Sequence, residues 1–455
     1  MKCTERYISK TLIRYSFPER ESTDLDGFDA VKFLTIFNCM GKNLKLIVIG
    51  GGAAGMIAAW RASLSGSSVV LLEKNPHLGI KILISGGGKC NITNGSDIKT
   101  MLKQFQTNES RFLKYAFHEF SNTDLVELLH TEGIETYTRD NGKVFPKSHD
   151  AEDVVSALRR LMEKEGVEIR LQQPVKEIRP LDDGTFTVIS GKRIHIAEKV
   201  IVATGGASYR KTGTTGDGYR WMQDLGHTIV PVRPALTPII LSPLPASTWQ
   251  GTPIRDCELL ALCGSSIVSR WKGDVLITHF GISGPATLEV SRKAFLEFEQ
   301  GKKVDMCVDF FPEYTPEQLN EKIVDEIKQN PSRSILTFIE QLVPQRLAEY
   351  LLTVVSVLFA KKLNQISKSE RTSVVKTLKQ LPLGTVKDIP LDRGEVTAGG
   401  VALNEVDYTS MESNIQKGLY LCGEILDIAG PVGGYNLQAA FSTGFVAGNH
   451  AGSCK

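Results

Sequence analysis

The sequence lacks the cysteine patterns that mark redox dithiols and structural zinc sites. Its eight cysteines include no C-x-x-C pair, and none joins a histidine at the spacing of zinc ligands. A dithiol reductase needs two thiols within exchange distance, so this class is excluded, and no metal is predicted. Scattered cysteines fit a reducing compartment, and we expect a cytoplasmic protein.

Long hydrophobic runs and an excess of charge are missing as well. No apolar run approaches the ~20 residues of a membrane span. Even the most hydrophobic helical stretch, at 347–360, is too short. We therefore expect a soluble protein with no membrane partner. The formal net charge of +2 indicates no dominant polyanionic partner.

The chain has the size and composition of a globular enzyme with more than one unit. It has 455 residues, of which 42% are hydrophobic and 23% are charged, and a single core stops growing well below this length. Residues 1–41 show no secretory or transit pattern, and Met40 stands directly before GKNLKLIVIGGG. We expect residues 1–41 to be an N-terminal extension, either mobile or non-native.

The first motif lies between a strand and a helix. KLIVIG at 45–50 is a short apolar run typical of a parallel strand buried on both faces. Gly50, Gly52 and Gly55 follow at the spacing G-x-G-x-x-G, and Glu73 closes the next strand, VVLLEK. Such glycines permit a tight turn and the close approach of a pyrophosphate to a helix N-terminus, while Glu73 can bond a ribose hydroxyl. The pattern predicts a dinucleotide site, with an ordinary tight turn as the alternative.

A second glycine-rich stretch raises the question of what lies against it. SGGGKCNITN at 85–94 has three consecutive glycines followed by polar side chains. An extended dinucleotide held at the first motif needs a flat slot at its far end, where side chains would collide with a ring. Asn91 and Asn94 offer donors and acceptors of the kind that read a flavin. We predict a flavin slot, with a flexible surface turn as the alternative, and interpret Cys90 as a packing residue.

The rest of the chain alternates between helical and extended patterns. Amphipathic helices are expected at 110–132 and 150–165, and short strands, including RIHIA and KVIVATGG, follow from 167. Prolines and short alternating strands continue to about 311, and amphipathic helices cover 315–381. The chain ends in strand, glycine-rich turn and helix. We expect the N-terminus of this last helix to face the flavin pyrimidine edge and to favour the reduced, anionic ring.

Six ordered motifs resemble the bacterial BaiN-type flavoproteins, also called aminoacetone-oxidase-like FAD-binding enzymes. They are LKLIVIGGGAAGMIAAWRA, GIKILISGGGKCNITN, VIVATGG, THFGISGPATLEVSR, EVTAGGVALNEVD and GLYLCGEILDIAGPVGGYNLQAAFSTGFVAG, and the resemblance spans residues from about 42 to 452. It implies an α/β fold in which a Rossmann-like FAD-binding domain, formed by both chain ends, is interrupted by an inserted β-barrel plus helical subdomain. The implied boundaries are 42–207 and 396–455 for the FAD-binding domain, 208–311 and 382–395 for the barrel, and 312–381 for the helical subdomain.

The resemblance also implies roles for individual residues. Toward the adenosine and pyrophosphate of FAD it implies Gly50, Gly52, Ala54, Gly55, Glu73, Lys74, Val175, Ala203, Thr204 and Gly205. Toward the flavin and its ribityl chain it implies Ser85, Gly86, Gly87, Gly88, Lys89, Cys90, Asn91, Thr93, Gly423, Glu424, Asp427, Gly433, Gly434, Tyr435 and Asn436. His279 and Ser283, in THFGISGP, are candidate catalytic residues for proton transfer. A structural role for His279 in a turn is the alternative.

The predicted function is that of an FAD-dependent oxidoreductase, which transfers a hydride between the flavin and a small or medium organic substrate. Reduction of an activated C=C bond and oxidation of an amine both stay open. No second strand-placed G-x-G-x-x-G is present, so NADH or NADPH is expected only as a transient electron donor.

Two other interpretations stay open. Residues 360–388 hold seven lysine and arginine residues against two acids, so the main alternative is an FAD-containing protein that binds or modifies RNA. A solvated helix face explains such a run more simply, and nucleic acid is not the expected partner. The third interpretation is a non-catalytic flavin sensor.

Overall fold

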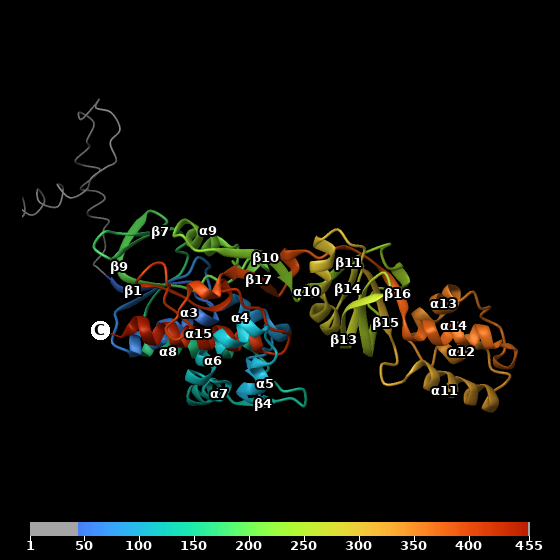
Figure 1. The fold of residues 1–455 in the computed structure, drawn as a ribbon. Helices are drawn as coiled ribbons and strands as arrows, with labels where there is room; N and C mark the ends of the chain where they lie inside the picture. Colours follow the sequence, from blue (N-terminus) through green and yellow to red (C-terminus); the bar gives the residue numbers. More distant parts are fainter. Residues whose placement is uncertain (1–43, 454–455) are drawn as a thin grey trace, which may run out of the picture. The chain divides into compact units, whose positions relative to one another are not determined.

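One sheet joins segments from both ends of the described chain. The computed structural model describes residues 44–453, so the expectations for residues 1–41 lie outside it. The parallel strands have the order β6-β2-β1-β9-β18 and lie at one end of the ribbon in Figure 1. They are β1 (Leu44–Ile49), β2 (Val69–Leu72), β6 (Glu168–Arg170), β9 (Arg193–Val202) and β18 (Leu419–Leu421).

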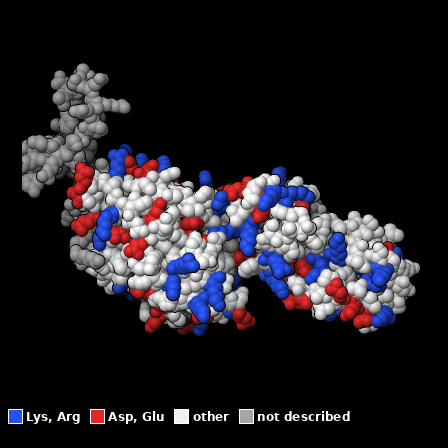
Figure 2. Space-filling view, in the orientation of Figure 1, with Lys and Arg blue, Asp and Glu red and all other residues white. Residues whose placement is uncertain are grey.

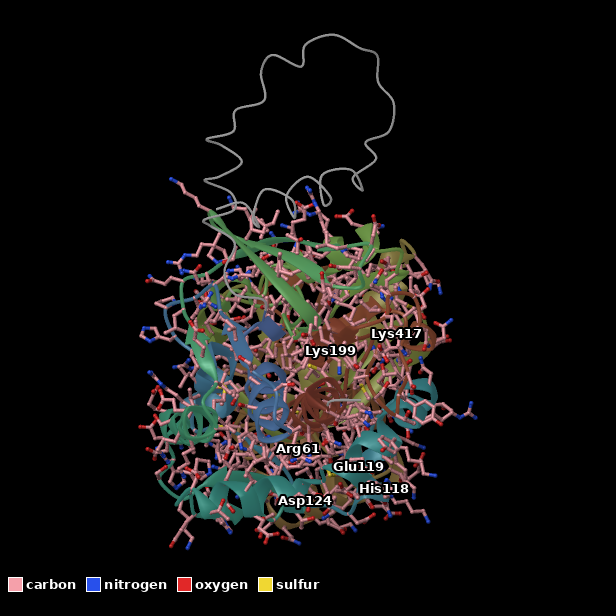
Figure 3. All side chains as sticks on the ribbon, turned by 90° about the vertical axis from the view of Figure 1, so that its left-hand side faces the viewer. Arg61, His118, Glu119, Asp124, Lys199 and Lys417 are labelled. Carbon is pink, nitrogen blue, oxygen red and sulfur yellow. The ribbon has the colours of Figure 1, made fainter. Side chains whose placement is uncertain are left out.

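Strand β9 is longer than expected. Its first residues pair antiparallel with β8 (Phe186–Ser190), which pairs with β7 (Val175–Pro180), and its last residues pair in parallel with β1 and β18. The expectation of two separate strands, RIHIA and KVIVATGG, is wrong because β9 continues through Glu198, and Ala197 and Lys199 on either side of it both pair with β1. Lys199 is in register with Leu46. Its ammonium, labelled in Figure 3, donates to the carbonyls of Ala451 and Ser453 at 2.9 and 3.2 Å.

Helices cover the sheet, and one expected helix is broken in two. The helices of this part are α3 (Ala53–Leu64), α4 (Ile80–Ile84), α5 (Ile98–Leu102), α6 (Thr107–Glu119), α7 (Asn122–Thr131), α8 (Ala151–Lys164), α9 (Asp217–Asp224) and α15 (Tyr435–Gly452). The single helix expected at 110–132 is α6 and α7, because Phe120 takes extended backbone. Ser121 then starts α7 by exchanging hydrogen bonds with Asp124 in a capping box.

Small residues bring α3 and α15 into backbone contact, and Figure 1 shows the two helices side by side. Gly444, Gly448 and Gly452 recur at every fourth residue of α15 and face the alanines of α3. A Cβ added at Gly448 would lie 2.4 Å from the carbonyl oxygen of Ala58. This close packing holds α3, and with it the turn after β1, in position.

The described chain also has two smaller sheets. Strands β3 (Thr93–Asn94), β5 (Lys143–Pro146) and β4 (Thr136–Thr138) form an antiparallel sheet in the order β3-β5-β4. Strands β10 (Ile229–Ala235) and β17 (Val396–Val401) pair antiparallel where the chain enters and leaves the insert.

The insert contains a closed barrel in the order β11-β14-β13-β12-β15-β16, in which β16 pairs back with β11. Its strands are β11 (Ile239–Ser242), β12 (Pro253–Cys263), β13 (Ser266–Ile277), β14 (Gly281–Ser283), β15 (Asp305–Asp309) and β16 (Leu381–Asp388). The 15-residue helix α10 (Pro285–Glu299) packs against β13 and β12. The expectation of strands throughout this stretch is wrong, because Pro285 occupies the first helical position and starts α10 directly after β14.

Four helices stand between β15 and β16, namely α11 (Pro316–Gln329), α12 (Ile335–Ile339), α13 (Gln345–Val354) and α14 (Lys368–Lys379). Leu319 and Leu351 from these helices share one buried core with Leu259 and Val308 of the barrel. The main sheet and its helices enclose a separate core. The fold class is therefore confirmed, whereas the domain boundaries given above stay predictions.

The described surface carries charges of both signs. Figure 2 shows basic and acidic side chains interspersed over the visible face. Within the run at 360–388, Lys361 pairs with Glu370 and Lys379 with Asp309, both at 2.6 Å. Part of this basic run therefore stabilises the insert itself. None of the helices in residues 44–453 is both long enough and apolar enough to cross a bilayer.

Candidate functional site

A cavity opens at the carboxyl edge of the parallel strands. Its volume is about 620 Å³, within the range of ~300–1,000 Å³ that small-molecule sites occupy. The residues that follow β1, β2, β9 and β18 all line it: Gly50, Glu73, Ala203 and Gly423. Open α/β sheets bind ligands at this edge, where the strand order reverses.

Most of the site residues predicted from the sequence lie on the wall of this cavity. They are Gly50, Gly52, Ala54, Glu73, Lys74, Ser85, Gly86, Gly87, Asn91, Val175, Ala203, Thr204, Gly205, Ser283, Gly423, Glu424, Gly433, Gly434 and Asn436. The other predicted residues lie off the wall: Gly55, Gly88, Lys89, Cys90, Thr93, His279, Asp427 and Tyr435.

The turn between β1 and α3 leaves room for a ligand. Gly52 has a φ of −83°, which any residue adopts, and a Cβ added there would meet no atom within 4 Å. The first N–H groups of α3 carry partial positive charge at this end of the helix. On the same wall, the hydroxyl of Thr204 is buried and has no partner among the described residues. Open space, a helix N-terminus and an unpaired hydroxyl fit the pyrophosphate of a dinucleotide.

Glu73 supports this turn and still faces the cavity. Its carboxylate accepts the N–H of Gly51 at 2.6 Å and that of Asn75 at 2.8 Å. A carboxylate has about four lone-pair sites, so acceptor capacity remains for a ribose hydroxyl. Lys74 instead donates to Asp217 at 2.7 Å and to Thr215 at 2.6 Å. Its predicted contact with the ribose stays a prediction.

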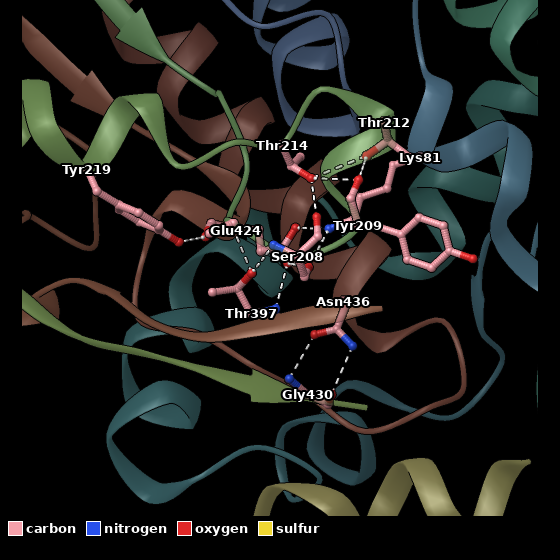
Figure 4. A network of polar contacts seen from close by, with 11 residues as sticks. Lys81, Ser208, Tyr209, Thr212, Thr214, Tyr219, Thr397, Glu424, Gly430 and Asn436 are labelled. Carbon is pink, nitrogen blue, oxygen red and sulfur yellow. Dashed lines mark hydrogen bonds and ion pairs between the residues drawn. The ribbon is translucent and has the colours of Figure 1, made fainter. Parts of the chain in front are cut away.

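A polar network, drawn in Figure 4, joins residues of the wall to loops beside it. Glu424 accepts from the ammonium of Lys81 at 2.5 Å and from the N–H of Thr397 at 2.8 Å. Asn436 bonds both the N–H and the carbonyl of Gly430, at 2.8 and 2.9 Å, so its amide shapes the loop before α15. These contacts hold the loops from which the predicted ribityl and flavin contacts come.

The three consecutive glycines have left-handed backbone. They form a 3₁₀ turn, η1 (Ser85–Gly88), with φ values of 59°, 69° and 85° at Gly86, Gly87 and Gly88, a region that L side chains rarely adopt. Gly86 and Gly87 line the cavity, and a Cβ added at Gly87 would meet no atom within 4 Å. The backbone conformation therefore favours glycine here, and the open space beside Gly87 leaves room for a ligand.

Residues behind the wall contact the protein itself. Cys90 is fully buried, and its burial raises the pKa of the thiol to about 12, which fits a packing role. Thr93 donates to Gln438 at 2.6 Å and links β3 to α15. Asp427 accepts the N–H of Gly399 at 3.0 Å.

The two candidate catalytic residues lie in different surroundings. Ser283 ends β14 and lines the cavity. His279 is exposed and off the wall, edge-on to Phe280 with ring centroids 5.1 Å apart. It belongs to a tight turn in which the backbone N–H of Thr278 donates to the carbonyl of Gly281 at 2.8 Å.

Lysine and acidic residues of the wall that were not predicted from the sequence are Lys81, Lys143, Asp217 and Glu395. Lys81 lies within GIKILISGGGKCNITN, and Glu395 is the first residue of EVTAGGVALNEVD, so both belong to motifs of the family resemblance. Lys143 begins β5 after the turn at Asn141 and Gly142. Its local sequence, NGKVFP, predicts a hairpin and says nothing about chemistry.

Comparisons with known proteins agree with this geometry. The family model described as HI0933-like protein Rossmann domain matches residues 44–450. A 3-dehydro-bile acid delta(4,6)-reductase of Clostridium scindens is 30% identical, over 89% of this chain and 98% of that protein. A ribosomal RNA dihydrouridine synthase of Escherichia coli is 31% identical, over 87% of this chain and 95% of that protein. The solved structure of an open flavocytochrome c3 fumarate reductase shares the fold, with a TM-score of 0.51 at 17% identity, over 96% of this chain and 83% of that one.

The sheet and the cavity at its carboxyl edge define an FAD-binding protein of the Rossmann-like class. The chain belongs to the HI0933-like Rossmann family, which confirms the resemblance to BaiN-type flavoproteins. It is an FAD-dependent oxidoreductase.

Proposed function

We propose that this protein reduces a C=C bond conjugated to a carbonyl group in a small or medium organic molecule, and that the wall residues assigned from the sequence hold FAD. The part of the wall contributed by the insert and its connecting strands carries the proposal. Leu236, Leu276, Leu288 and Val396 make this part apolar. Such a wall, with a few polar groups, suits a flat and largely hydrophobic substrate. FAD, when bound, supplies the hydride chemistry.

The names of two relatives support the same bond type. One is a delta(4,6)-reductase that acts on a 3-dehydro-bile acid, and the other is a dihydrouridine synthase. A 3-oxo group conjugates with a neighbouring ring C=C, and the C=C that uridine loses on forming dihydrouridine is likewise conjugated to a carbonyl. Both reactions add a hydride and a proton across such a bond. Amine oxidation, the other reaction expected from the sequence, has no comparable support.

We also propose NADH or NADPH as a transient electron donor. The glycine-rich turn after β1 is assigned to FAD, so a nicotinamide has to reach the flavin from the substrate side and leave before the substrate enters. We also propose that the protein is cytoplasmic. The cysteines of the described chain that are free thiols support it: Cys90, Cys257, Cys263, Cys307 and Cys422.

Anaerobic flavin spectroscopy tests the proposal. The FAD-loaded protein is mixed with NADH or NADPH, and the reduced protein is then offered a panel of enones, while oxidised protein is offered a panel of amines. We expect bleaching by a nicotinamide and rapid reoxidation by at least one enone. Bleaching by an amine, together with no reoxidation by any enone, would contradict it.

A second candidate is FAD-dependent modification of RNA, which the name of the Escherichia coli relative favours. Uridine carries the same conjugated C=C, so the chemistry is shared and the partner differs. Retention on ribosomal RNA that weakens steeply with salt would support this candidate. Lys362, Lys368 and Lys376, in the basic run of the insert, are the first residues to replace.

A further inference from the structure

Two charged side chains on the cavity wall have no ion-pair or hydrogen-bond partner among residues 44–453. The other lysine and acidic residues of the wall are engaged in the hydrogen bonds and ion pairs described above: Glu73, Lys74, Lys81, Asp217 and Glu424. Lys143 and Glu395 make no ion pair and no side-chain hydrogen bond with any residue of 44–453. Lys143 is partly buried, Glu395 is exposed, and both side chains line the cavity, so both are free to meet a ligand.

Lys143 lies next to the loop before α15. It begins β5, in register with Asn94 of β3. The amide of Asn94 donates to the carbonyl of Gly433 at 3.1 Å, and Gly433 and Gly434 line the same cavity. Lys143 therefore reaches the wall close to the predicted flavin slot.

Glu395 approaches from the insert. It precedes β17, and its N–H donates to the carbonyl of Leu236 at 3.0 Å. A second carboxylate, that of Glu289 on α10, accepts the N–H of Val432 at 2.5 Å. Burial raises the pKa of the Glu395 and Glu289 carboxyls, and the charge of Lys143 opposes this rise in both, so the three side chains share one electrostatic environment. Apolar Leu288 and Val396 stand beside them in sequence and line the cavity.

We propose that Lys143 binds the carbonyl oxygen of the substrate and that Glu395 donates the proton that completes the reduction. This inference rests on the proposed function. When a hydride adds to the carbon β to the carbonyl, the π electrons of the C=C bond shift and place negative charge on the carbonyl oxygen. The ammonium of Lys143 stabilises that charge.

A proton transfer then completes the reduction. The carbon α to the carbonyl takes a proton from the carboxyl of Glu395, the carbonyl reforms, and the substrate has gained one hydride and one proton. The two electrons come from the reduced flavin, which is thereby oxidised. Glu395 is exposed, because its side chain opens onto the cavity, so water can return its proton.

The surroundings of Glu395 suit a proton donor. Burial by the protein around the cavity raises the pKa of its carboxyl, while Lys143 and Lys81 partly oppose this. A carboxyl with a raised pKa keeps its proton closer to neutral pH. Burial also raises the pKa of Glu289, to about 7, against the N–H of Val432 and the charge of Lys143. Titration of both carboxyls is therefore expected to contribute to the pH dependence of the reaction rate.

A phenol tests the role of Lys143 without turnover. The oxidised, FAD-loaded protein is titrated with para-nitrophenol, whose phenolate oxygen imitates the charged carbonyl oxygen and whose absorbance reports its ionisation. We expect Lys143→Gln to weaken phenolate binding about 10- to 100-fold, the effect of one charge-assisted hydrogen bond. Lys147→Gln is the matched control, because Lys147 is an exposed lysine that pairs with Glu135. Unchanged phenolate binding in Lys143→Gln overturns the assignment.

The reduction potential of bound FAD separates the substrate from the cofactor as the partner of Lys143. Both lysine variants are titrated anaerobically. We expect Lys143→Gln to change the free energy of flavin reduction less than it changes the free energy of phenolate binding. A large fall in potential with unchanged phenolate binding would place the ammonium against the flavin and overturn the proposal.

The face of protonation tests Glu395. Reduced protein reacts in D₂O with an α-substituted enone that reoxidises it, and the position of deuterium on the α carbon is determined by NMR. Wild type and Glu289→Gln are expected to place deuterium on one face. Glu395→Gln is expected to react more slowly and to place it on both faces, since solvent becomes the donor. One-faced deuteration at the wild-type rate in Glu395→Gln overturns the assignment. If no enone reoxidises the wild type, the proposed function has failed, and the phenol titration still decides the role of Lys143.

Discussion

Gly50, Gly52 and Gly55 follow one another in a single turn, but their surroundings differ. A Cβ added at Gly50 would lie 2.4 Å from the carbonyl oxygen of Ala203, and one added at Gly55 would lie 1.8 Å from the carbonyl oxygen of Gly50. Both positions are closed by the protein. At Gly52 the space is open and the backbone is ordinary. Two glycines therefore hold the turn together, and the third leaves room for the cofactor.

This difference predicts opposite outcomes for two similar substitutions. Gly52→Val should fold with a near-normal Tm but lose FAD affinity about 10- to 100-fold, because the added methyl groups occupy the place of the pyrophosphate and overpacking costs ~1–3 kcal/mol. Gly50→Val should instead fail to fold or melt far lower. Circular dichroism and the ratio of released FAD to protein measure both. Full FAD loading of a folded Gly52→Val variant would show that the open space is not the cofactor's.

At Glu289 the folded protein predicts a pH dependence of stability. Burial raises the pKa from 4.5 to about 7, so between these values the folded state binds more protons than the unfolded state. Stability contributed by this group is then fully present below pH 4.5, falls as pH rises, and is lost above 7. Near pH 4.5 the free energy of unfolding of Glu289→Gln should equal that of the wild type. At pH 8 it should exceed that of the wild type by about 1–2 kcal/mol, after solvent screening. Denaturant midpoints measure this, with Glu297→Gln on the same helix as the control. An equal difference at both pH values would rule out titration of Glu289.

Among the elements, α15 has the most consequences for the site. Its face of small residues packs against α3, and its first turn follows Gly434, where a Cβ would lie 2.4 Å from the backbone of Thr93. The helix thus connects the pyrophosphate turn with the predicted flavin slot. Helix α10 of the insert holds the loop before α15, because Arg292 donates to the carbonyl of Ala429 at 2.9 Å. Packing of these elements positions loops that have little structure of their own.

The α3–α15 contact predicts a large effect from one methyl group. Gly448→Ala should destabilise the protein by about 1–3 kcal/mol, because the added Cβ pushes the two helices apart. Asn449→Ala, at the next position, removes only a hydrogen bond from Arg61 and should cost about 0.5–1.5 kcal/mol. Thermal melts with and without added FAD measure both. An equal or smaller effect at Gly448 would mean that the helices have room to move.

At the scale of the whole described chain, the two largest hydrophobic cores belong to different segments of the sequence. One lies around the main sheet, and the other is shared by the barrel and the four helices of the insert. The cofactor turn belongs to the first. Ligand binding stabilises the unit that it contacts most extensively.

Two cores predict two unfolding transitions. Leu351→Ala, in the insert core, should lower the transition of residues 239–389 by ~2–5 kcal/mol, and Gly448→Ala should lower that of the main sheet. Removal of FAD should lower mainly the transition of the main sheet. Hydrogen exchange read segment by segment distinguishes them. A single transition shifted equally by both variants would show that the cores unfold together.

Local patterns predicted a large part of this fold and site. The turn from β1 to α3, the three glycines after Ile84 and the helix expected at 150–165, observed as Ala151–Lys164, all depend on neighbouring residues. Pairing between distant segments was not predictable in the same way. The continuity of β9 depends on β1 and β18, which lie far away in the chain.

The sequence by itself therefore determined the βα turn that receives a dinucleotide, because glycine spacing and apolar periodicity express local backbone requirements. The six ordered motifs, through the family that they resemble, indicated the class of protein and FAD. Only the tertiary structure decided which charged side chains are already paired and which stand free on the cavity wall. Lys143 reaches the wall through the pairing of β5 with β3, and Glu395 through the pairing of β17 with β10. The partner of a charge is set by distances between segments that lie far apart in the sequence, and no local pattern contains those distances.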